Sequence, residues 1–247
     1  NAINTSMLQA INKAMDEAED NSNVRAIVLK GAGKSFSAGF DLNDEVWDTE
    51  EDSEMRAALE DDFNTIMRFW DSTKPTIAVV QGHCVGGAME MALACDVTIA
   101  AENAMFGEPE VSIASGIVAM LLPWLTGPKL AKELLLTGRI NIPSQRIYEM
   151  GLINQVVKES ELDKAGLEMA ETIASNDRLC VEVTKRAINR TLEIGGMREA
   201  LLDALEADVL YETADNDEAK AFYKVLKDKG LKAAKEWRKE FINKTSS

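Results

Sequence analysis

Two glutamates lie where a carboxyl group could take part in acid–base chemistry. Glu90 stands three residues after Gly87, one turn into a short apolar helix, where poor solvation would raise its pKa toward the range of a general acid or base. Glu110 follows a turn-like run at residues 106–109. Because Asp and Glu make up 42 of the 247 residues, spacing alone does not select this pair, and a solvated surface glutamate is the competing interpretation of Glu110.

Two glycine-containing turns could supply hydrogen-bond donors to such a pair. Both follow an expected strand: residues 34–41 read KSFSAGFD and residues 82–90 read GHCVGGAME. In the second turn, Gly86 and Gly87 open a helix with no side chain over its first N–H groups, which suits a carboxylate, a phosphate or a developing oxyanion. The alternative is that these glycines only allow a helix and a strand to pack closely.

The remaining reactive side chains favour no second chemistry. His83 is the only histidine, has no partner carboxylate nearby in the sequence and is expected to be a structural or surface residue. The three cysteines lack C-x-x-C spacing, so the sequence predicts neither a zinc site nor a disulfide framework, and no metal is expected. The sequence contains no G-x-S-x-G, G-x-G-x-x-G or P-loop motif. The pair Lys224 and Lys227 is expected to be a solvated helix face.

The charge balance bears on the partners of the protein. There are 27 Lys and Arg residues against 42 Asp and Glu residues, a formal net charge of −15. This balance disfavours nucleic-acid binding but allows a small anionic ligand held by local cations and N–H groups. The longest apolar run, residues 117–125, is too short to span a bilayer. No secretory signal opens the given sequence, so we expect no membrane association and a cytoplasmic location.

Strands and helices are expected to alternate over the first two thirds of the chain. Continuous apolar runs predict strands, and apolar residues at helical spacing predict helices. Thr5 and Ser6 are expected to cap the first helix, and the acidic stretch 44–54 is expected to be a mobile loop. Beyond about residue 175 the chain is expected to be helical, which gives an α/β core with a C-terminal helical layer. The predicted strands are 24–30, 75–80, 96–101 and 152–157.

These segments together resemble one known family. Several linked motifs occur in the family's order over nearly the full length of the chain, and that combination is far more specific than one glycine pair. The chain resembles the crotonase (enoyl-CoA hydratase/isomerase) superfamily. The resemblance is carried by residues 1–4 (NAIN), 31–42 (GAGKSFSAGFDL), 74–100 (KPTIAVVQGHCVGGAMEMALACDVTIA), 106–111 (FGEPEV), 134–140 (LLLTGRI) and 150–157 (MGLINQVV).

The resemblance implies an α/β fold of the crotonase type, a spiral of repeated ββα units with two roughly perpendicular sheets. On this basis residues 1–185 are expected to form the spiral core, and residues 186–247 a C-terminal helical region used in trimerisation. The strand hairpin that normally precedes the segment matching residues 1–4 is expected to be missing. A homotrimer or a dimer of trimers is the expected assembly.

The resemblance also implies an acyl-CoA substrate and a set of site residues. The backbone N–H groups of Phe40 and Gly87 would form an oxyanion hole, which agrees with the free helix start inferred above. Glu90 and Glu110 would be the catalytic pair. The expected CoA-binding set comprises Lys34 as a phosphate neighbour, the backbone at Ser37 and Ala38, and Phe40, Asp41 and Gly87.

The presence of both glutamates favours addition of water across an α,β-unsaturated acyl-CoA thioester, because isomerases of the family usually keep only the second. One carboxylate would take a proton from the water attacking C3 and the other would supply the C2 proton, and the sequence leaves open which does which. An isomerase, an aryl-propenoyl-CoA hydratase–aldolase and a hydrolase are alternatives, as is an acyl-CoA-binding or RNA-binding relative without turnover. No cofactor beyond the CoA of the substrate is expected, since the thioester supplies the acidity.

One stretch departs from the family pattern. Typical hydratases carry a glycine-rich P-G-x-G-G run after the second glutamate, whereas residues 115–120 here read SGIVAM. The departure leaves the acid–base pair in place but puts in doubt how water is held and which acyl group fits. Trp47, Met120 and Trp124 could shape an unusual pocket, and plain core packing is the alternative for each.

Overall fold

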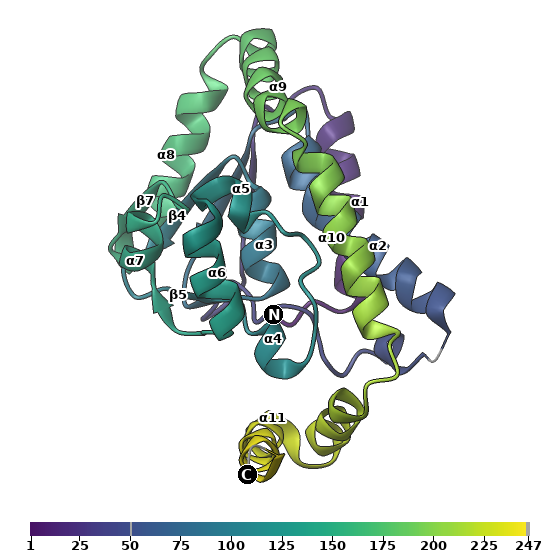
Figure 1. The fold of residues 1–247 in the computed structure, drawn as a ribbon. Helices are drawn as coiled ribbons and strands as arrows, with labels where there is room; N and C mark the ends of the chain where they lie inside the picture. Colours follow the sequence, from purple (N-terminus) through teal and green to yellow (C-terminus); the bar gives the residue numbers. More distant parts are fainter. Residues whose placement is uncertain (50, 246–247) are drawn as a thin grey trace.

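A computed structural model describes residues 1–49 and 51–245 (Figure 1). Over these residues strands and helices alternate as far as residue 157, and the later elements are helical, as the sequence predicts. The elements are α1 (Thr5–Asp20), β1 (Ile27–Lys30), the 3-10 helix η1 (Glu45–Asp48), α2 (Asp52–Asp71), β2 (Thr76–Val80), β3 (His83–Val85), α3 (Gly87–Ala94), β4 (Val97–Ala101), β5 (Met105–Gly107), α4 (Glu110–Ile113), α5 (Leu122–Thr126), α6 (Pro128–Thr137), β6 (Ile142–Pro143), α7 (Ser144–Glu149), β7 (Gln155–Val157), the 3-10 helix η2 (Glu159–Glu161), α8 (Leu162–Ala174), α9 (Arg178–Ile194), α10 (Met197–Glu212) and α11 (Asp217–Thr245).

The first sheet contains the four strands that the apolar runs predict. Its order is β1-β2-β4-β7 and its three pairings are parallel. Every residue of β2 is buried, which explains why it reads as a continuous apolar run rather than an alternating one. Helix α8 packs against β1, β2 and β4 of this sheet.

The second sheet consists of short strands in the order β3-β5-β6; the family resemblance implies a second sheet, but the apolar pattern does not predict these strands. Strands β3 and β5 pair in parallel, with Val85 opposite Gly107, and β6 joins β5 antiparallel. With two or three residues each, these strands are too short to show a hydrophobic period. They are nevertheless the strands that lead directly into α3 and α4.

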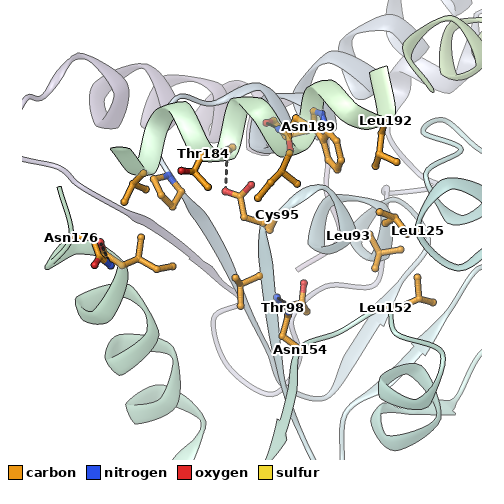
Figure 2. Close-up of a pocket in the computed structure, with 18 of the residues that line it drawn as sticks. Leu93, Cys95, Thr98, Leu125, Leu152, Asn154, Asn176, Thr184, Asn189 and Leu192 are labelled. Atoms are coloured by element: carbon orange, nitrogen blue, oxygen red, sulfur yellow. Dashed lines mark hydrogen bonds and ion pairs between the residues drawn. The ribbon is translucent and has the colours of Figure 1, made fainter. Parts of the chain in front are cut away.

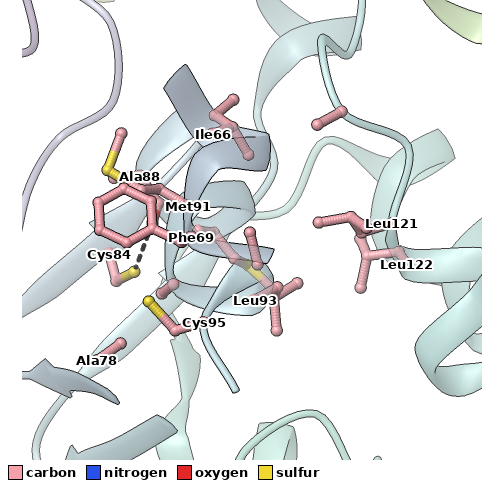
Figure 3. Close-up of a cluster of buried hydrophobic side chains, with 14 of the residues drawn as sticks. Ile66, Phe69, Ala78, Cys84, Ala88, Met91, Leu93, Cys95, Leu121 and Leu122 are labelled. Atoms are coloured by element: carbon pink, nitrogen blue, oxygen red, sulfur yellow. Dashed lines mark hydrogen bonds between the residues drawn. The ribbon is translucent and has the colours of Figure 1, made fainter. Parts of the chain in front are cut away.

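Helix α3 forms the centre of the core (Figure 3). All eight of its residues are buried, so it lacks the polar face of a surface helix. Phe69 of α2 and Cys84 of β3 lie beside it, and the Cys84 thiol donates a hydrogen bond to the Ala88 carbonyl at 3.4 Å. A glutamate inside this helix, Glu90, is therefore largely shielded from water.

The beginnings of two helices differ from the predictions. Asn4, not Thr5 or Ser6, caps α1, because its side-chain oxygen accepts a hydrogen bond from the Met7 N–H at 3.0 Å. Thr5 instead donates its N–H and hydroxyl to Asp44, at 2.6 and 2.9 Å. In the acidic stretch 44–54, expected to be a mobile loop, η1 forms and α2 begins; residue 50 lies outside the described residues.

The C-terminal helices differ in what they pack against. The expected boundary between residues 185 and 186 falls within α9, where Lys185 is buried and its Nζ lies 2.8 Å from an Asp96 oxygen. Helix α11 breaks at Gly230, which has φ 81°, and Figure 1 shows it below α4, away from the sheets. It joins α4 through a small apolar core of its own: Ile113, Ala114, Phe222 and Ala234.

Among the described helices, none has both the length and the apolar character needed to traverse a lipid bilayer.

Candidate active site

Three parallel chain segments end at one edge and position the candidate groups. The segment 36–40 runs beside β3, where the Ser37 N–H donates to the His83 carbonyl at 3.0 Å and the Val85 N–H donates to the Ser37 carbonyl at 3.3 Å. On its other side β3 pairs with β5. Because parallel segments have their carboxyl ends on the same edge, the residues that follow them are brought together.

The predicted amide donors meet at this edge. Hydrogen bonds between Ile3 and both Gly39 and Asp41 flank Phe40 and leave its own N–H on the opposite side. Gly87 is the first residue of α3, so its N–H has no partner within the helix. Within the described part of the chain, neither of these two N–H groups donates to a protein acceptor.

Close approach of the two backbones requires glycine. A Cβ on Gly39, which has φ 88°, would lie 2.7 Å from the Val85 carbonyl oxygen and 3.6 Å from the Gly87 nitrogen. A Cβ on Gly87 would lie 2.2 Å from the Phe40 ring. The structure therefore places Gly87 against the Phe40 ring and Gly39 beside Val85 and Gly87, and a side chain at either glycine would require its neighbours to shift.

Both predicted catalytic carboxyls reach the same place, together with a third. Glu90 of α3, Glu108 after β5 and Glu110 of α4 each place an oxygen within 4.8 Å of the others. Glu90 is 3% exposed, and its Oε2 accepts a hydrogen bond from the Ala119 N–H at 2.7 Å. A Cβ on Gly86 would lie 2.5 Å from Glu110 Oε1, which places that carboxyl against the start of α3.

Burial raises the pKa values of these carboxyls. For Glu90, loss of hydration is the largest cause and the nearby Glu110 charge is the second, and together they hold its pKa well above the ordinary value. Burial also raises the pKa of Glu110 to about 7, although hydrogen bonds from its own N–H and from Glu108 act in the opposite direction. Three carboxyls this close cannot all be ionised, so the cluster keeps protons near neutral pH.

Two further buried acids lie between α2 and α10. Asp62 and Asp208 are 2% and 5% exposed, and burial raises the pKa of both, that of Asp208 to about 7. Their charges are smaller contributions to the raised pKa of Glu90. They add to the acidic surroundings of the site without touching it.

Sequence reasoning did not select Glu108, although it is the most buried of the three glutamates. It lies between Gly107 and Pro109 and is 1% exposed. The only signal in the sequence is its place between Gly107 and Pro109, after two apolar residues, and one acid among 42 carries little weight. Its proximity to Glu90 depends on the pairing of β3 with β5, which the sequence does not predict.

The amides and carboxyls open into a cavity of about 490 Å³. Trp47, Met55, Leu59 and Val118 form apolar walls near Glu90 and Glu110. Of the aromatic and methionine residues considered as pocket formers, Trp47 lines this cavity, and its Nε1 donates to the Asp41 carbonyl at 3.0 Å. Met120 and Trp124 do not line it, and they pack against the core.

The predicted CoA-binding residues separate into two groups. Ala38, Phe40 and Gly87 line the cavity. Lys34 is exposed and, with Ser37 and Asp41, lies outside its lining.

Ser37 and Asp41 make local contacts that hold the oxyanion segment. The Ser37 hydroxyl donates to the Asn1 carbonyl at 2.6 Å and accepts from the Gly39 N–H at 3.1 Å. The Asp41 carboxylate accepts from the Asn43 N–H at 3.0 Å. His83 is exposed on β3, in agreement with the prediction of a surface or structural residue.

Helix α11 brings lysines to the mouth of the cavity. It is held over α4 by hydrogen bonds from the Tyr223 hydroxyl to the Ala114 carbonyl, at 3.2 Å, and from Arg238 to the Ser112 carbonyl, at 2.9 Å. The prediction of a solvated helix face is therefore incomplete, because the exposed lysines also face a pocket. The lysines that line it are Lys220, Lys224, Lys227 and Lys235.

The three carboxyls form the only described group of acids, cysteines or histidine close enough to share a metal ion. Such an oxygen set would suit Mg²⁺ or Ca²⁺, and Mg²⁺ keeps several of its waters when bound. The space beside Glu90 and Glu108 is walled by Leu93, Ile117 and Leu135 and does not hold even one water molecule. A protonated cluster fits these surroundings better than a hydrated cation does.

A larger cavity of about 700 Å³ lies elsewhere, beneath α9 (Figure 2). Leu93, Leu125, Leu152 and Leu192 gather at one end of it. The acid on its wall, Asp96, is ion-paired with the buried Lys185. This cavity contains neither the amide donors nor the glutamate cluster, so we place the chemistry in the smaller one.

Comparison with known proteins agrees with this architecture. The family model described as "Enoyl-CoA hydratase/isomerase" matches residues 1–244. A crystal structure of an enoyl-CoA hydratase/isomerase from Xanthobacter autotrophicus Py2 superimposes with a TM-score of 0.92 at 47% identity, covering 96% of this chain and 88% of that one. The predicted crotonase-type fold is thereby confirmed.

Curated relatives give the same result. A short-chain-enoyl-CoA hydratase of Clostridium acetobutylicum is 34% identical over 244 residues, covering 94% of this chain and 90% of the relative. A crotonyl-CoA hydratase of Syntrophomonas wolfei is 34% identical over 225 residues, covering 88% and 84% respectively. Because the family model matches residues 1–244 of the 247-residue chain, the chain belongs to the enoyl-CoA hydratase/isomerase family.

Proposed function

We propose that the protein adds water across the double bond of an α,β-unsaturated acyl-CoA thioester. The observation that carries this proposal is the meeting of two amide donors with the carboxyls of Glu90 and Glu110 at one cavity. The printed names of the Clostridium and Syntrophomonas relatives, both hydratases, support it. The proposed reaction needs no metal or redox cofactor.

The amides of Phe40 and Gly87 act on the thioester carbonyl. As water adds to C3, negative charge moves onto this oxygen and an enolate forms. Two N–H groups fixed in advance stabilise that charge more than they stabilise the neutral substrate, and removal of one such donor typically costs about 3 kcal/mol of barrier. The apolar walls around them exclude water that would weaken these hydrogen bonds.

The carboxyl pair balances the protons of the reaction. One carboxylate takes a proton from the water whose oxygen bonds to C3, and the other carboxyl gives its proton to C2. The pair therefore starts with one proton and ends with one proton, now on the other member. Buried carboxyls at this separation favour such a singly protonated state, because simultaneous ionisation of both is opposed by burial and by their mutual repulsion.

Glu90→Gln and Glu110→Gln test the proposal directly. With crotonyl-CoA as substrate, we expect each variant to lose at least about 10²-fold in kcat, because an amide neither accepts nor supplies the proton. The loss of the conjugated thioester absorbance measures hydration. Glu102→Gln, at an exposed position outside the cavity, is the matched control and should retain wild-type kcat.

Other outcomes separate the alternatives. Unchanged crotonyl-CoA together with conversion of a 3-enoyl-CoA identifies an isomerase. Tight binding of acyl-CoA esters without turnover of a broad panel identifies a non-catalytic relative. Wild-type turnover in either glutamine variant removes that glutamate from the mechanism.

The α11 lysines are proposed to bind the phosphates of CoA. We expect the double variant Lys224→Ala/Lys235→Ala to raise KM for crotonyl-CoA about tenfold with kcat nearly unchanged, because the lost ion pairs lie away from the reacting carbons. Crotonyl-pantetheine, which lacks the nucleotide phosphates, should show no such change. Lys239→Ala, on the same helix but outside the cavity lining, is the control. An equal rise in KM for both thioesters would contradict the assignment.

Gly87→Ala tests the amide pair. The new Cβ would overlap the Phe40 ring, so the ring or the start of α3 must shift beside the two amides, and we expect kcat for hydration to fall about 10²-fold in a folded protein. Gly33→Ala serves as control, since a Cβ there has nothing within 4 Å although its φ of 78° also disfavours alanine. It should lose some thermal stability while keeping its turnover. Full activity in Gly87→Ala would argue against an oxyanion hole at this place.

We also propose that the protein assembles as a homotrimer or a dimer of trimers. Large apolar side chains stand exposed on α6 and α10, with Leu136 and Leu210 at 71% and 69%, and burial of such side chains between subunits would remove apolar surface from water. Light scattering should give a mass three or six times the 27.1 kDa of the chain. A mass of one chain at micromolar concentration would contradict the proposal.

A further inference from the structure

The proposed mechanism leaves one buried titratable group without a task. Glu108 is 1% exposed, and among the described residues its two carboxyl oxygens have no hydrogen-bond partner. Its backbone is fixed, because its N–H donates to the Arg139 carbonyl at 3.1 Å while β5 precedes it. A carboxyl held in this way without a cation or an amide partner requires a physical explanation.

Every titratable group that faces Glu108 is an acid or a thiol. Glu90 approaches from α3 and Glu110 from α4, both within 4.8 Å, and the buried Cys84 thiol lies on β3. The rest of the wall is apolar, and the space beside it is too small for a water molecule. No positive charge among the described residues offsets an ionised Glu108.

An ionised Glu108 would add a second negative charge beside that of the Glu90 and Glu110 pair, on a wall with neither water nor a counter-ion, which is strongly unfavourable. A protonated Glu108 has an O–H to donate, and Glu110 of α4, which has an oxygen within 4.8 Å of it, offers a carboxylate acceptor. The same burial that raises the pKa of Glu108 well above its usual range thus makes it a neutral donor. Its hydrogen bond acts to lower the pKa of Glu110.

We propose that Glu108 is a positioning residue. It keeps its proton throughout turnover, and its O–H donates a hydrogen bond to the carboxylate of Glu110. This rests on the proposed function, since it supplies one member of the catalytic pair with a fixed orientation and a stabilised charge. The pair can then carry one negative charge at neutral pH. Without the donor, the first ionisation of the pair requires a higher pH.

Two substitutions separate hydrogen-bond donation from filling of space. Glu108→Gln replaces the O–H by an amide N–H and should keep kcat/KM for crotonyl-CoA within about threefold, with the acidic limb of its pH profile unmoved. Glu108→Met fills the space without a donor and should shift that limb upward by about one pH unit, so that the activity loss at pH 6 exceeds that at pH 9 about tenfold. Leu135→Met, on the same apolar wall, should leave the limb unchanged.

A purely structural role predicts lower thermal stability in both Glu108 variants without a shift of the limb, and that result would overturn the proposal. So would a glutamine variant whose limb moves downward, because removal of a real negative charge would lower the pKa of the neighbouring acids.

Infrared spectroscopy supplies a readout that does not depend on turnover. We expect the difference spectrum between the wild type and Glu108→Gln to contain one carboxylic-acid C=O band that persists across pH 6–8. Disappearance of this band from the wild type within that range would refute the proposal. A wild type that shows the band but does not hydrate crotonyl-CoA would refute the proposed function and leave the protonation of Glu108 standing.

Discussion

The site depends on one constraint, the parallel pairing of segment 36–40 with β3 and of β3 with β5. Backbone hydrogen bonds fix the register of these segments, so the backbone sets the positions of the reactive side chains. The carboxyl ends then place an amide, a helix start and two glutamates within a few ångströms of one another. Gly39 is required where the segments touch, because a Cβ there would collide with the Val85 carbonyl. The chemistry follows from this backbone arrangement.

The surroundings of that edge determine what the groups can do. Helix α3 is buried on all sides, and a carboxyl within it loses most of its hydration. Such burial destabilises an ionised group, but it also keeps a proton available at neutral pH and strengthens every hydrogen bond inside the cavity. Asp62 and Asp208 extend the acidic surroundings beyond the site. Burial of these carboxyls lowers the stability of the folded protein, and the same burial gives them pKa values suited to proton transfer.

The parts of the structure that follow from local pattern were predictable. Residue type and spacing predict the apolar strands of the first sheet and the helical C-terminus. They also predict that Glu90 lies one helical turn after Gly87. The short strands β3 and β5 show no period, and Glu108 depends on them for its position. Lys224 and Lys235 could not be assigned either, because their contribution depends on how α11 folds back over α4. The cap at Asn4 shows that neighbouring residues compete for the same N–H group.

The lysines at the cavity mouth stand on a molecule with a formal net charge of −15. At a distance, such a protein repels a ligand that carries several phosphates, whereas within about 10 Å, the screening length at 0.1 M salt, the local cations reverse the sign of the field. Added salt therefore has two opposing effects on diffusional encounter: it weakens the long-range repulsion and also weakens the final capture. The net acidity of the molecule thus opposes the distant approach of a polyanion, whereas the lysines at the entrance favour its final capture.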